Sequence, residues 1–396
     1  MVALPVEGPE ALGLARVDGK RLARLAAKAL HCDAAVVTSV EVDVVDYPIG
    51  SIATGSLTRC RGTAVDEFGS TRNWSIFVKQ LQSARVWPML HVVPEHLRES
   101  YVDGFPWRNE IEAQQSTRLA SVLPDGIRLP ELYELVEIDA DRAAMWMEDV
   151  DVVADCWTTE RFAHAARLLG VLAGRRPLGS DTAIGDPVHA ATPGASLSMY
   201  VEGRVRHGLG PLLSKDELWR HPALVAELEA AGETALRPGL VAALGHLEMW
   251  LALMNALPQT LVHGDASPQN LLVPRSAPDT FVAIDWGFSS PHCVGFDLGQ
   301  LLVGLANVGE LPSSQLPTVA AAIFPAYLDG LASTGYEATP ERVRLGFVAS
   351  LVVRTLFCAL PLEELLATDS PALRARLRSR IGLTRFLLDL SAELTS

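Results

Sequence analysis

Two acidic motifs lie close together in this chain. The first is HGDASPQN at residues 263–270, and the second is AIDWG at residues 283–287, so that Asp285 follows Asp265 by twenty residues. Phosphoryl transfer needs little covalent help from a protein. An enzyme for it orients an acceptor hydroxyl and neutralises phosphate charge with Mg²⁺. Asp265, Asn270 and Asp285 are the residue types for that work, one base and two metal ligands.

The segments around these residues predict how they meet. QTLVH at residues 259–263 is typical of a strand, and the apolar residues 281–284 predict a second strand that ends at the carboxylate of Asp285. The turn-forming residues PRSAPD separate the two strands. We therefore expect a hairpin-like excursion that returns Asp285 beside Asn270. Either carboxylate alone is more typical of an ordinary solvated turn, and it is the set of three residues that favours a function.

The pattern H-G-D-x-x-x-x-N followed by I-D-W-G resembles the aminoglycoside phosphotransferase and choline kinase-like family, which shares the protein kinase fold. The resemblance implies an α+β, bilobal protein kinase-like fold with an antiparallel-sheet N-lobe and a mainly helical C-lobe. It implies that Asp265 is the catalytic base, and that Asn270 and Asp285 hold Mg²⁺ on the phosphates of ATP. His263 would then support the loop, and Asp297 would be a structural carboxylate that holds it.

A kinase of this kind also needs a lysine on the phosphates, and WSIFVKQL at residues 74–81 offers Lys79 on a predicted strand. A buried ammonium requires a carboxylate or phosphate partner. The resemblance implies a glutamate on the next helix, which we predict over residues 108–122. Glu110 and Glu112 face different directions there, so only one can meet Lys79. We select Glu110 by resemblance, with Glu112 as the alternative; a solvated edge lysine remains a third interpretation.

Two further segments are candidates for nucleotide binding. Small residues, among them Ser51 and Gly55, occupy a predicted loop between two strands, where backbone N–H groups can approach phosphate oxygens. No Walker motif is present, and a plain turn explains the same residues. The run AAMWMEDVDV resembles the connection between the lobes of the family. It implies that backbone groups from Glu148 to Val150 bind the adenine edge, although a strand end would need no ligand.

The length of 396 residues exceeds the roughly 250–300 at which one core stops growing, so two lobes are expected. We predict a nucleotide-binding lobe over 1–150, beginning with an amphipathic helix at residues 10–31, and strands over 36–93 and up to residue 147. Helical periodicity over 151–396 predicts the lobe with the catalytic loop and the acceptor site. The irregular interval 174–211 is either a lid over the acceptor or a connector.

Composition bears on partners and compartment. The net charge of −14 argues against nucleic acid and is compatible with a cationic acceptor. Five scattered cysteines without a CxxC pair favour a reducing compartment and no zinc site. The N-terminus lacks the pattern of a signal peptide, and the longest apolar stretches are interrupted before about 18 residues accumulate. We expect a cytoplasmic protein without a membrane partner; the oligomeric state is left open.

One departure separates the chain from protein kinases. Two residues past Asp265, where they usually carry lysine, it has Ser267, which small-molecule kinases of the family tolerate. We therefore predict an ATP- and Mg²⁺-dependent phosphotransferase acting on a hydroxyl of a small molecule. An aminoglycoside or related sugar-containing antibiotic is the leading acceptor class, with His189, His207, Glu248, Trp250 and Trp286 as undecided pocket residues. The alternatives are a kinase for Ser or Thr of a biosynthetic peptide and a non-catalytic pseudokinase that acts through a partner.

Overall fold

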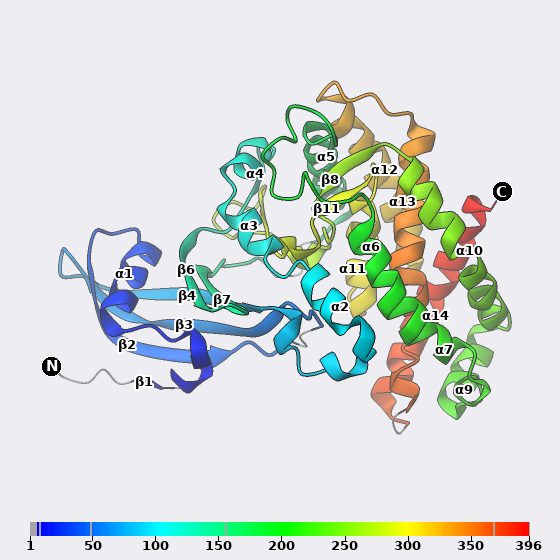
Figure 1. Cartoon of the computed structure of the whole chain (residues 1–396), viewed down its shortest axis with the longest axis horizontal. Helices are drawn as coiled ribbons and strands as arrows, with labels where there is room; N and C mark the ends of the chain where they lie inside the picture. Colours follow the sequence, from blue (N-terminus) through cyan, green and yellow to red (C-terminus); the bar gives the residue numbers. More distant parts are fainter. Residues whose placement is uncertain (1–5, 8, 48–49, 155–156, 367–368, 396) are drawn as a thin grey trace. The chain divides into compact units, whose positions relative to one another are not determined.

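The computed structural model describes residues 6–7, 9–47, 50–154, 157–366 and 369–395. The chain divides into two compact units (Figure 1). The first comprises Met1–Ser116 and Leu129–Val152, and the second comprises Thr117–Arg128 and Val153–Ser396. The predicted division after residue 150 lies two residues before the one in the structure. It was wrong for 117–128, which the sequence placed in the first lobe.

The first unit is built on one six-stranded sheet of order β1-β2-β3-β4-β7-β6. Within this sheet β1 pairs with β2 in parallel, and all other neighbouring strands pair antiparallel. The strands are β1 Val6–Glu7, β2 Ala35–Val44, β3 Thr54–Asp66, β4 Thr71–Gln82, β6 Leu132–Asp139 and β7 Arg142–Glu148. The helices of this unit are α1 Gly19–Ala29, α2 Arg98–Gly104 and α3 Asn109–Gln115. Strand structure ends at Gln82 rather than continuing to residue 93. Ser83 caps a 3-10 turn at Ala84–Val86 by accepting the Arg85 N–H, and prolines at 88 and 94 disfavour a strand in the residues that follow.

Strand β7 is buried on both faces, which explains its apolar sequence AAMWM. Ala144 and Trp146 contribute to the core cluster that α1 shares, whereas Met145 and Met147 belong to a second cluster that includes Ile111 of α3. Successive side chains of a strand point to opposite faces. Each helix therefore covers its own face of the sheet.

The N-terminal helix begins later than predicted. Instead of one helix over 10–31, a 3-10 segment, Pro9–Ala15, precedes α1. Asp18 stops the chain from continuing as one helix, because its carboxylate caps α1 by accepting a hydrogen bond from the Arg21 N–H at 2.8 Å. Arg21 and Lys28 then contact Glu134 and the Tyr133 carbonyl of β6. These two basic side chains thus join the helix to the sheet.

The helix predicted over 108–122 is two helices, α3 and α4 (Thr117–Val122), separated by Ser116 in extended conformation. Serine competes for backbone hydrogen bonds and favours such interruptions. The break coincides with the boundary between the units. Residues 117–128 join the second unit because Arg118 donates to the Thr182 carbonyl and β5 (Ile127–Arg128) pairs with β10.

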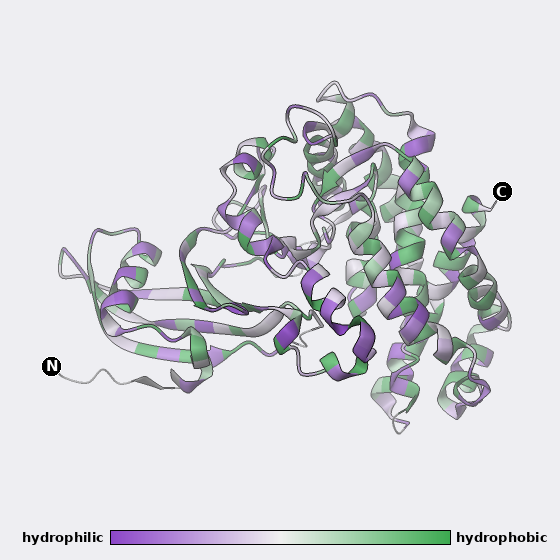
Figure 2. Cartoon of the chain, viewed as in Figure 1, coloured by the Kyte–Doolittle hydropathy of each residue, from purple (hydrophilic) through white to green (hydrophobic). Residues whose placement is uncertain are grey.

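The second unit is mainly helical. Its helices are α4, α5 Thr159–Arg175, α6 Ala195–Tyr200, α7 Gly210–Leu213, α8 Asp216–Trp219, α9 Pro222–Ala231, α10 Leu236–Ala256, α11 Asp297–Val308, α12 Leu316–Ala332, α13 Pro340–Thr355 and α14 Pro371–Ser391. A nine-residue π-helix, Val201–Leu209, follows α6. Hydrophobic residues predominate along α12 (Figure 2), which packs against α5.

Helix α10 is long and apolar enough by composition to cross a membrane, a property that core helices of soluble proteins share. Among its 21 residues, the buried ones recur at intervals of three and four, from Leu240 through Ala243 and Leu247 to Trp250 and Met254. This is the spacing of a helix that packs one face on a protein core.

Short strands of the second unit position its central loop. β8 (Gln259–Val262) pairs antiparallel with β11 (Ser290–Cys293), and β9 (Leu271–Leu272) pairs antiparallel with β10 (Phe281–Ala283). The segment 263–270 therefore connects two paired elements, and the hairpin of β9 and β10 returns the chain to it, as predicted.

The interval 174–211 is more regular than predicted, since it is helical from Ala195 onwards. Its first part is held by a buried ion pair in which the Arg176 guanidinium donates to both carboxylate oxygens of Asp186, at 2.8 and 2.9 Å. Arg176 also donates to the Leu261 carbonyl of β8 at 2.7 Å. These contacts attach residues 176–186 to β8, the strand that precedes the loop 263–270.

Candidate functional site

The loop after β8 brings Asp265 and Asn270 into direct contact. The Asn270 side-chain amide donates to the backbone carbonyl of Asp265 at 2.9 Å and to its carboxylate at 3.1 Å. The Asn270 carbonyl in turn accepts the N–H of Ile284 at 3.0 Å, which places Asp285 one residue from this contact. The three residues that the sequence selected are thus brought together within the second unit.

Asp285 has a left-handed backbone, with φ 60° and ψ 56°. A non-glycine residue in this region is uncommon, and such backbone strain concentrates at functional sites. Because the ladder of β10 stops at Ala283, the chain turns at Asp285 into the 3-10 segment Trp286–Phe288. The strand therefore ends one residue earlier than predicted.

His263 is buried and connects the two halves of the site. Its Nε2 lies 3.0 Å from the Ile284 carbonyl, and its Nδ1 accepts the N–H of Asp265 at 3.2 Å. Both contacts are satisfied by a neutral ring with the proton on Nε2. Burial lowers the pKa of His263 to about 4, partly offset by the nearby Asp285 carboxylate, so the ring stays neutral near pH 7. This fits the supporting role expected from the sequence.

Asp297, at the start of α11, holds the same loop through hydrogen bonds to its backbone. Its two carboxylate oxygens accept the N–H of His263 at 3.0 Å and the N–H of Gly264 at 2.8 Å. Burial raises its pKa to about 6, against the opposing effect of these two hydrogen bonds. The geometry is that of a structural carboxylate, as expected from the family motif that Asp297 matches.

Two glycines are required by close packing of the loop. Gly264 has φ +88°, and a Cβ there would lie 2.2 Å from the Phe288 carbonyl oxygen. On α11, a Cβ at Gly304 would lie 2.7 Å from Pro268 and 2.8 Å from the Gln269 side chain. Gln269 also donates to the Gly304 carbonyl at 3.0 Å. The loop thus rests directly on the backbone of α11.

Arg354 of α13 is a site residue that was not predicted from the sequence. Its guanidinium donates to the Gly264 carbonyl, lies 3.5 Å from the Asp265 carboxylate and packs over the Phe288 ring, 4.3 Å from the centroid. The side chain is 11% exposed. A charged residue inside the apolar run LVVRTLF was the available signal, because a buried arginine requires a partner.

In the first unit, the structure pairs Lys79 with Glu110 and not with the exposed Glu112. The ammonium of Lys79 lies 2.6 Å from the Glu110 carboxylate, and the two side chains are only 9% and 10% exposed. Lys79 shares with Leu81 the face of β4 that α3 covers, as alternation along the strand requires. The solvated edge lysine is excluded by this burial.

Of the two small residues predicted to lie in a phosphate-binding loop, only one lies outside a strand. Ser51 is exposed and precedes β3, whereas Gly55 lies inside β3 at an irregularity in its pairing with β4, not in the loop. A Cβ at Gly55 would lie 3.0 Å from the end of the Gln82 side chain and 3.2 Å from the end of Gln80, both of which are flexible. Residues 48 and 49 of the predicted loop lie outside the described residues.

Glu148 ends β7, and its N–H donates to the Glu131 carbonyl at 2.8 Å. That N–H is therefore used within the unit. Val150 is the last residue of the segment 148–150, which was predicted to bind adenine. It lies beyond the end of β7 at Glu148.

The five undecided pocket residues are dispersed. Trp250 and Trp286 are each 1% exposed and belong to the core, and Glu248 is exposed and pairs with Arg206. The remaining two make local hydrogen bonds in which the ring Nδ1–H donates, from His189 to the Asp186 carbonyl and from His207 to the Glu202 carbonyl. The structure does not gather them into one pocket.

In the part of the chain that the structure describes, no group of three His, Cys, Asp or Glu side chains forms a self-sufficient metal centre. A magnesium ion bound to nucleotide needs fewer protein ligands, because phosphate oxygens and waters complete its octahedral shell. Asn270 uses its amide nitrogen toward Asp265, so its oxygen is the atom suited to a cation. Asn270 and Asp285 fit such a partial site.

Residues 160–342 match the model of a phosphotransferase enzyme family. No curated protein matches the sequence. Solved structures with a similar chain course include a putative aminoglycoside phosphotransferase from Ralstonia eutropha, with 14% identity, a TM-score of 0.47, and 96% of this chain and 98% of that one covered. An aminoglycoside phosphotransferase from Alicyclobacillus acidocaldarius has 14% identity and a TM-score of 0.46, covering 85% and 90%. An ethanolamine kinase from Plasmodium vivax has 12% and 0.43, covering 87% and 81%. These values are too low for the neighbours' substrates to identify the acceptor here.

The five antiparallel strands of the first unit and the helical second unit confirm the predicted α+β architecture, with an antiparallel-sheet N-terminal lobe and a mainly helical C-terminal lobe. The family match lies wholly in the second unit and includes every residue of the loop and the strand that ends before Asp285. It confirms the resemblance to the aminoglycoside phosphotransferase and choline kinase-like family, and identifies the chain as a phosphotransferase enzyme with a hydroxyl group as acceptor.

Proposed function

We propose that the protein transfers the γ-phosphoryl group of ATP to a hydroxyl of a small molecule, with Mg²⁺ as the metal. The observation that carries the proposal is the contact of Asp265 with Asn270, supported from below by Asp297 and His263. A carboxylate on a rigid, hydrogen-bonded loop is suited to accept a proton from a positioned hydroxyl.

In the proposed reaction the acceptor oxygen forms a bond to the γ-phosphorus, and the bond from that phosphorus to the β–γ bridging oxygen breaks. The electron pair of the broken bond leaves with ADP, and the hydroxyl proton passes to the Asp265 carboxylate. Asn270 and Asp285 would hold Mg²⁺, which neutralises phosphate charge when bound.

Lys79 is the proposed phosphate-binding group of the first unit. Glu110 holds its ammonium at 2.6 Å, which fixes a long side chain that would otherwise lose entropy on binding. Among the backbone groups chosen from the sequence, Val150 is the proposed adenine contact, because the N–H of Glu148 already donates to Glu131. Ser51 remains a proposed phosphate contact, whereas Gly55, which lies inside β3 and not in the loop, is not proposed as one.

For the acceptor, the sequence favoured an aminoglycoside or related sugar-containing antibiotic, and antibiotic resistance would follow from its phosphorylation. This class rests on the family resemblance alone.

The thiols Cys32, Cys60, Cys293 and Cys358 are free, which supports the proposal of a reducing, cytoplasmic setting. Cys156 lies outside the described residues.

The test uses the purified full chain with ATP, Mg²⁺ and a panel of aminoglycosides, amino sugars, sugar acids and peptides, with ADP release and the mass of the product as readouts. Asp265→Asn keeps the size of the side chain and removes the base. It should abolish transfer while sparing ATP binding. Transfer by this variant at the wild-type rate would contradict the assignment of the base. Transfer to peptide alone, or ATP binding without any acceptor, would favour the peptide kinase or the pseudokinase.

A further inference from the structure

A cavity of about 220 Å³ adjoins the catalytic loop within the second unit. Its lining residues come from α6, α11, α13, the turn after α13, and α14. They are Tyr200, Gln300, Asn307, Arg354, Thr355, Cys358 and Arg380. Polar atoms make up most of the surface that these residues present to the cavity. A space of this size and polarity fits a small, hydrogen-bonding group.

The charge of the cavity is positive. Two of the described lining residues are arginines, and none of them is Asp or Glu. The Arg380 guanidinium donates to the neutral side-chain oxygen of Asn307 at 2.6 Å. The structure gives it no ion pair with a described carboxylate, and desolvation lowers its pKa. A guanidinium in such surroundings favours an anion as its partner.

Nearby carboxylates do not cancel this charge. Glu363 forms a bidentate pair with Arg204, at 2.6 and 2.7 Å, and Glu364 pairs with Arg376 at 2.5 Å. Each of these pairs is neutral as a unit. Of the two arginines that line the cavity, only Arg354 forms an ion pair with a described carboxylate, that of Asp265 at 3.5 Å. Glu364 acts on Arg380 from a greater distance, and the positive charge of its partner Arg376 opposes this effect.

Arg354 also links the cavity to the chemistry. The same guanidinium that forms part of the cavity wall contacts Asp265 and the carbonyl of Gly264. One molecule can therefore present a hydroxyl to Asp265 and an acidic group to the two arginines. A cationic amine in this cavity would instead meet Arg354 and Arg380, and like charges at close range oppose binding.

We propose that this cavity, the anion subsite, binds a carboxylate or phosphate group of the acceptor, so that the acceptor is a hydroxylated acid and not the polycationic aminoglycoside that the sequence favoured. The proposal rests on the phosphotransferase function proposed above and names the chemical class of its acceptor. The acidic group undergoes no bond change, and the phosphoryl transfer proceeds at the hydroxyl as already described.

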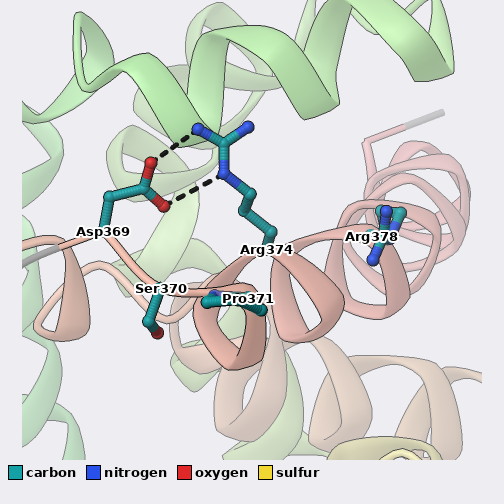
Figure 3. Close-up of a pocket in the computed structure, with 5 residues that line it drawn as sticks. All are labelled: Asp369, Ser370, Pro371, Arg374 and Arg378. Carbon is teal, nitrogen blue, oxygen red and sulfur yellow. Dashed lines mark hydrogen bonds and ion pairs between the residues drawn. The ribbon is translucent and has the colours of Figure 1, made fainter.

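A second cavity, of about 270 Å³, is lined by Asp369, Ser370, Pro371, Arg374 and Arg378 (Figure 3). Here the carboxylate of Asp369 engages the guanidinium of Arg374 in two hydrogen bonds, at 3.1 and 2.5 Å. The charge of Arg374 is thus compensated inside the protein. Arg378 of α14 does not take part in this pair and can serve as a control for substitution of Arg380. It is exposed, lies outside the anion subsite, and is two residues from Arg380 on the same helix.

The experiment compares four acceptors of similar size: gluconate with a carboxylate, glucose 6-phosphate with a phosphate, neutral glucose and cationic glucosamine. ADP release is measured for each with ATP and Mg²⁺, and binding of each is measured separately by calorimetry without nucleotide. We expect binding and turnover with at least one of the two acids and much weaker effects with glucose and glucosamine. The two acids distinguish a carboxylate from a phosphate.

Arg380→Gln should raise the Kd and KM for the preferred acid about tenfold, the effect of losing one hydrogen bond to a charged group, with kcat nearly unchanged. Arg380→Lys keeps the charge and should lose less affinity. Arg378→Gln removes a charge from the same helix and should change neither constant. Thermal unfolding of each variant verifies that it is folded. A merely structural role for Arg380 would alter stability and kcat without this separation.

The outcomes separate the two proposals. Binding of an acid that depends on Arg380, without turnover of any acceptor, would support the anion subsite while the phosphotransferase proposal fails. Turnover of glucosamine in preference to both acids, abolished by Asp265→Asn, would support the phosphotransferase and overturn the subsite. The subsite is also overturned if neither acid binds, or if both bind Arg380→Gln as tightly as the wild type.

Discussion

The guanidinium of Arg354 lies 3.5 Å from the carboxylate of Asp265, although one residue stands on α13 and the other on the loop after β8. Protein kinases usually carry a lysine two residues past the base, where this chain has Ser267. A distant helix therefore supplies a cation beside the base. Its contacts with the Gly264 carbonyl and the Phe288 ring hold it in one orientation.

Arg354 is consequently expected to position Asp265. We predict that Arg354→Gln lowers kcat at saturating ATP and acceptor about 10- to 100-fold, because a hydrogen bond to a charged group contributes about 1.5–3 kcal/mol. Arg354→Lys should recover only part of kcat, since an ammonium lacks the planar fork that reaches two oxygens. Steady-state kinetics with ATP and acceptor varied separately provides the measurement. A kcat that does not respond to either change would show that the contact is only structural.

The ion pair of Lys79 and Glu110 separates stability from function. Breaking a buried pair by removing one partner costs about 3–5 kcal/mol, whereas replacing both by apolar residues is often neutral. We predict that Glu110→Ala strongly destabilises the first unit and weakens ATP binding. The double variant Lys79→Met, Glu110→Leu should regain stability in urea unfolding, yet still bind ATP poorly by calorimetry.

Glu112→Ala is the matched control for this experiment, because Glu112 is exposed on the same helix, two residues from Glu110. We expect it to change stability by no more than about 0.5 kcal/mol, as for most surface substitutions. Recovery of ATP affinity in the double variant would mean that Lys79 does not contact the phosphates.

What could be predicted from the sequence was local. The contact of Asp265 with Asn270 follows from five residues of one loop, and the return of Asp285 follows from a hairpin with recognisable turn residues. Lys79 was predictable from its place on a strand, and helix phase showed that only one of Glu110 and Glu112 can meet it. The choice of Glu110 between the two came from the family resemblance.

The remaining features depend on packing between distant segments. Arg354 lies in an apolar helix whose periodicity says nothing about the loop that it meets. The break at Ser116 depends likewise on the attachment of Arg118 to Thr182 in the second unit. The apolar periodicity also predicted too long an N-terminal helix. The helix begins only after Asp18, because the Asp18 carboxylate caps its first turn.

A buried histidine outside the catalytic loop provides a test of pH dependence. His292 stacks on Phe296 with centroids 4.0 Å apart, lies 3.1 Å from the Ser196 hydroxyl, and has a pKa lowered to about 3 by burial. Between about pH 3 and 6.5 the unfolded chain binds a proton at this residue and the folded chain does not. Folding stability therefore decreases as the pH falls below 6.5.

The corresponding variant is His292→Gln, which can keep the hydrogen bond to Ser196 but does not titrate. The wild type should lose stability with falling pH more steeply than the variant, by up to about 1.4 kcal/mol per pH unit between pH 4 and 6. Asp297 acts in the opposite sense, since its raised pKa makes the folded chain bind the extra proton, but it is present in both proteins and cancels. Denaturant unfolding across this range measures both slopes. Parallel slopes would show that His292 titrates normally in the folded protein.

The packing of the loop on α11 predicts opposite effects for one substitution at two helical glycines. In a helix interior, alanine is favoured over glycine by about 0.5–1 kcal/mol. At Gly245, in α10, a Cβ would meet no atom within 4 Å, so Gly245→Ala should stabilise the protein by about that amount and leave kcat unchanged. At Gly304 the same Cβ would lie 2.7 Å from Pro268, whose ring cannot move without the loop. Gly304→Ala should therefore lower the melting temperature and reduce kcat while the KM for ATP changes little. Equal stabilisation at both positions would contradict the close contact between the loop and α11, and with it the rigidity on which the proposed role of Asp265 depends.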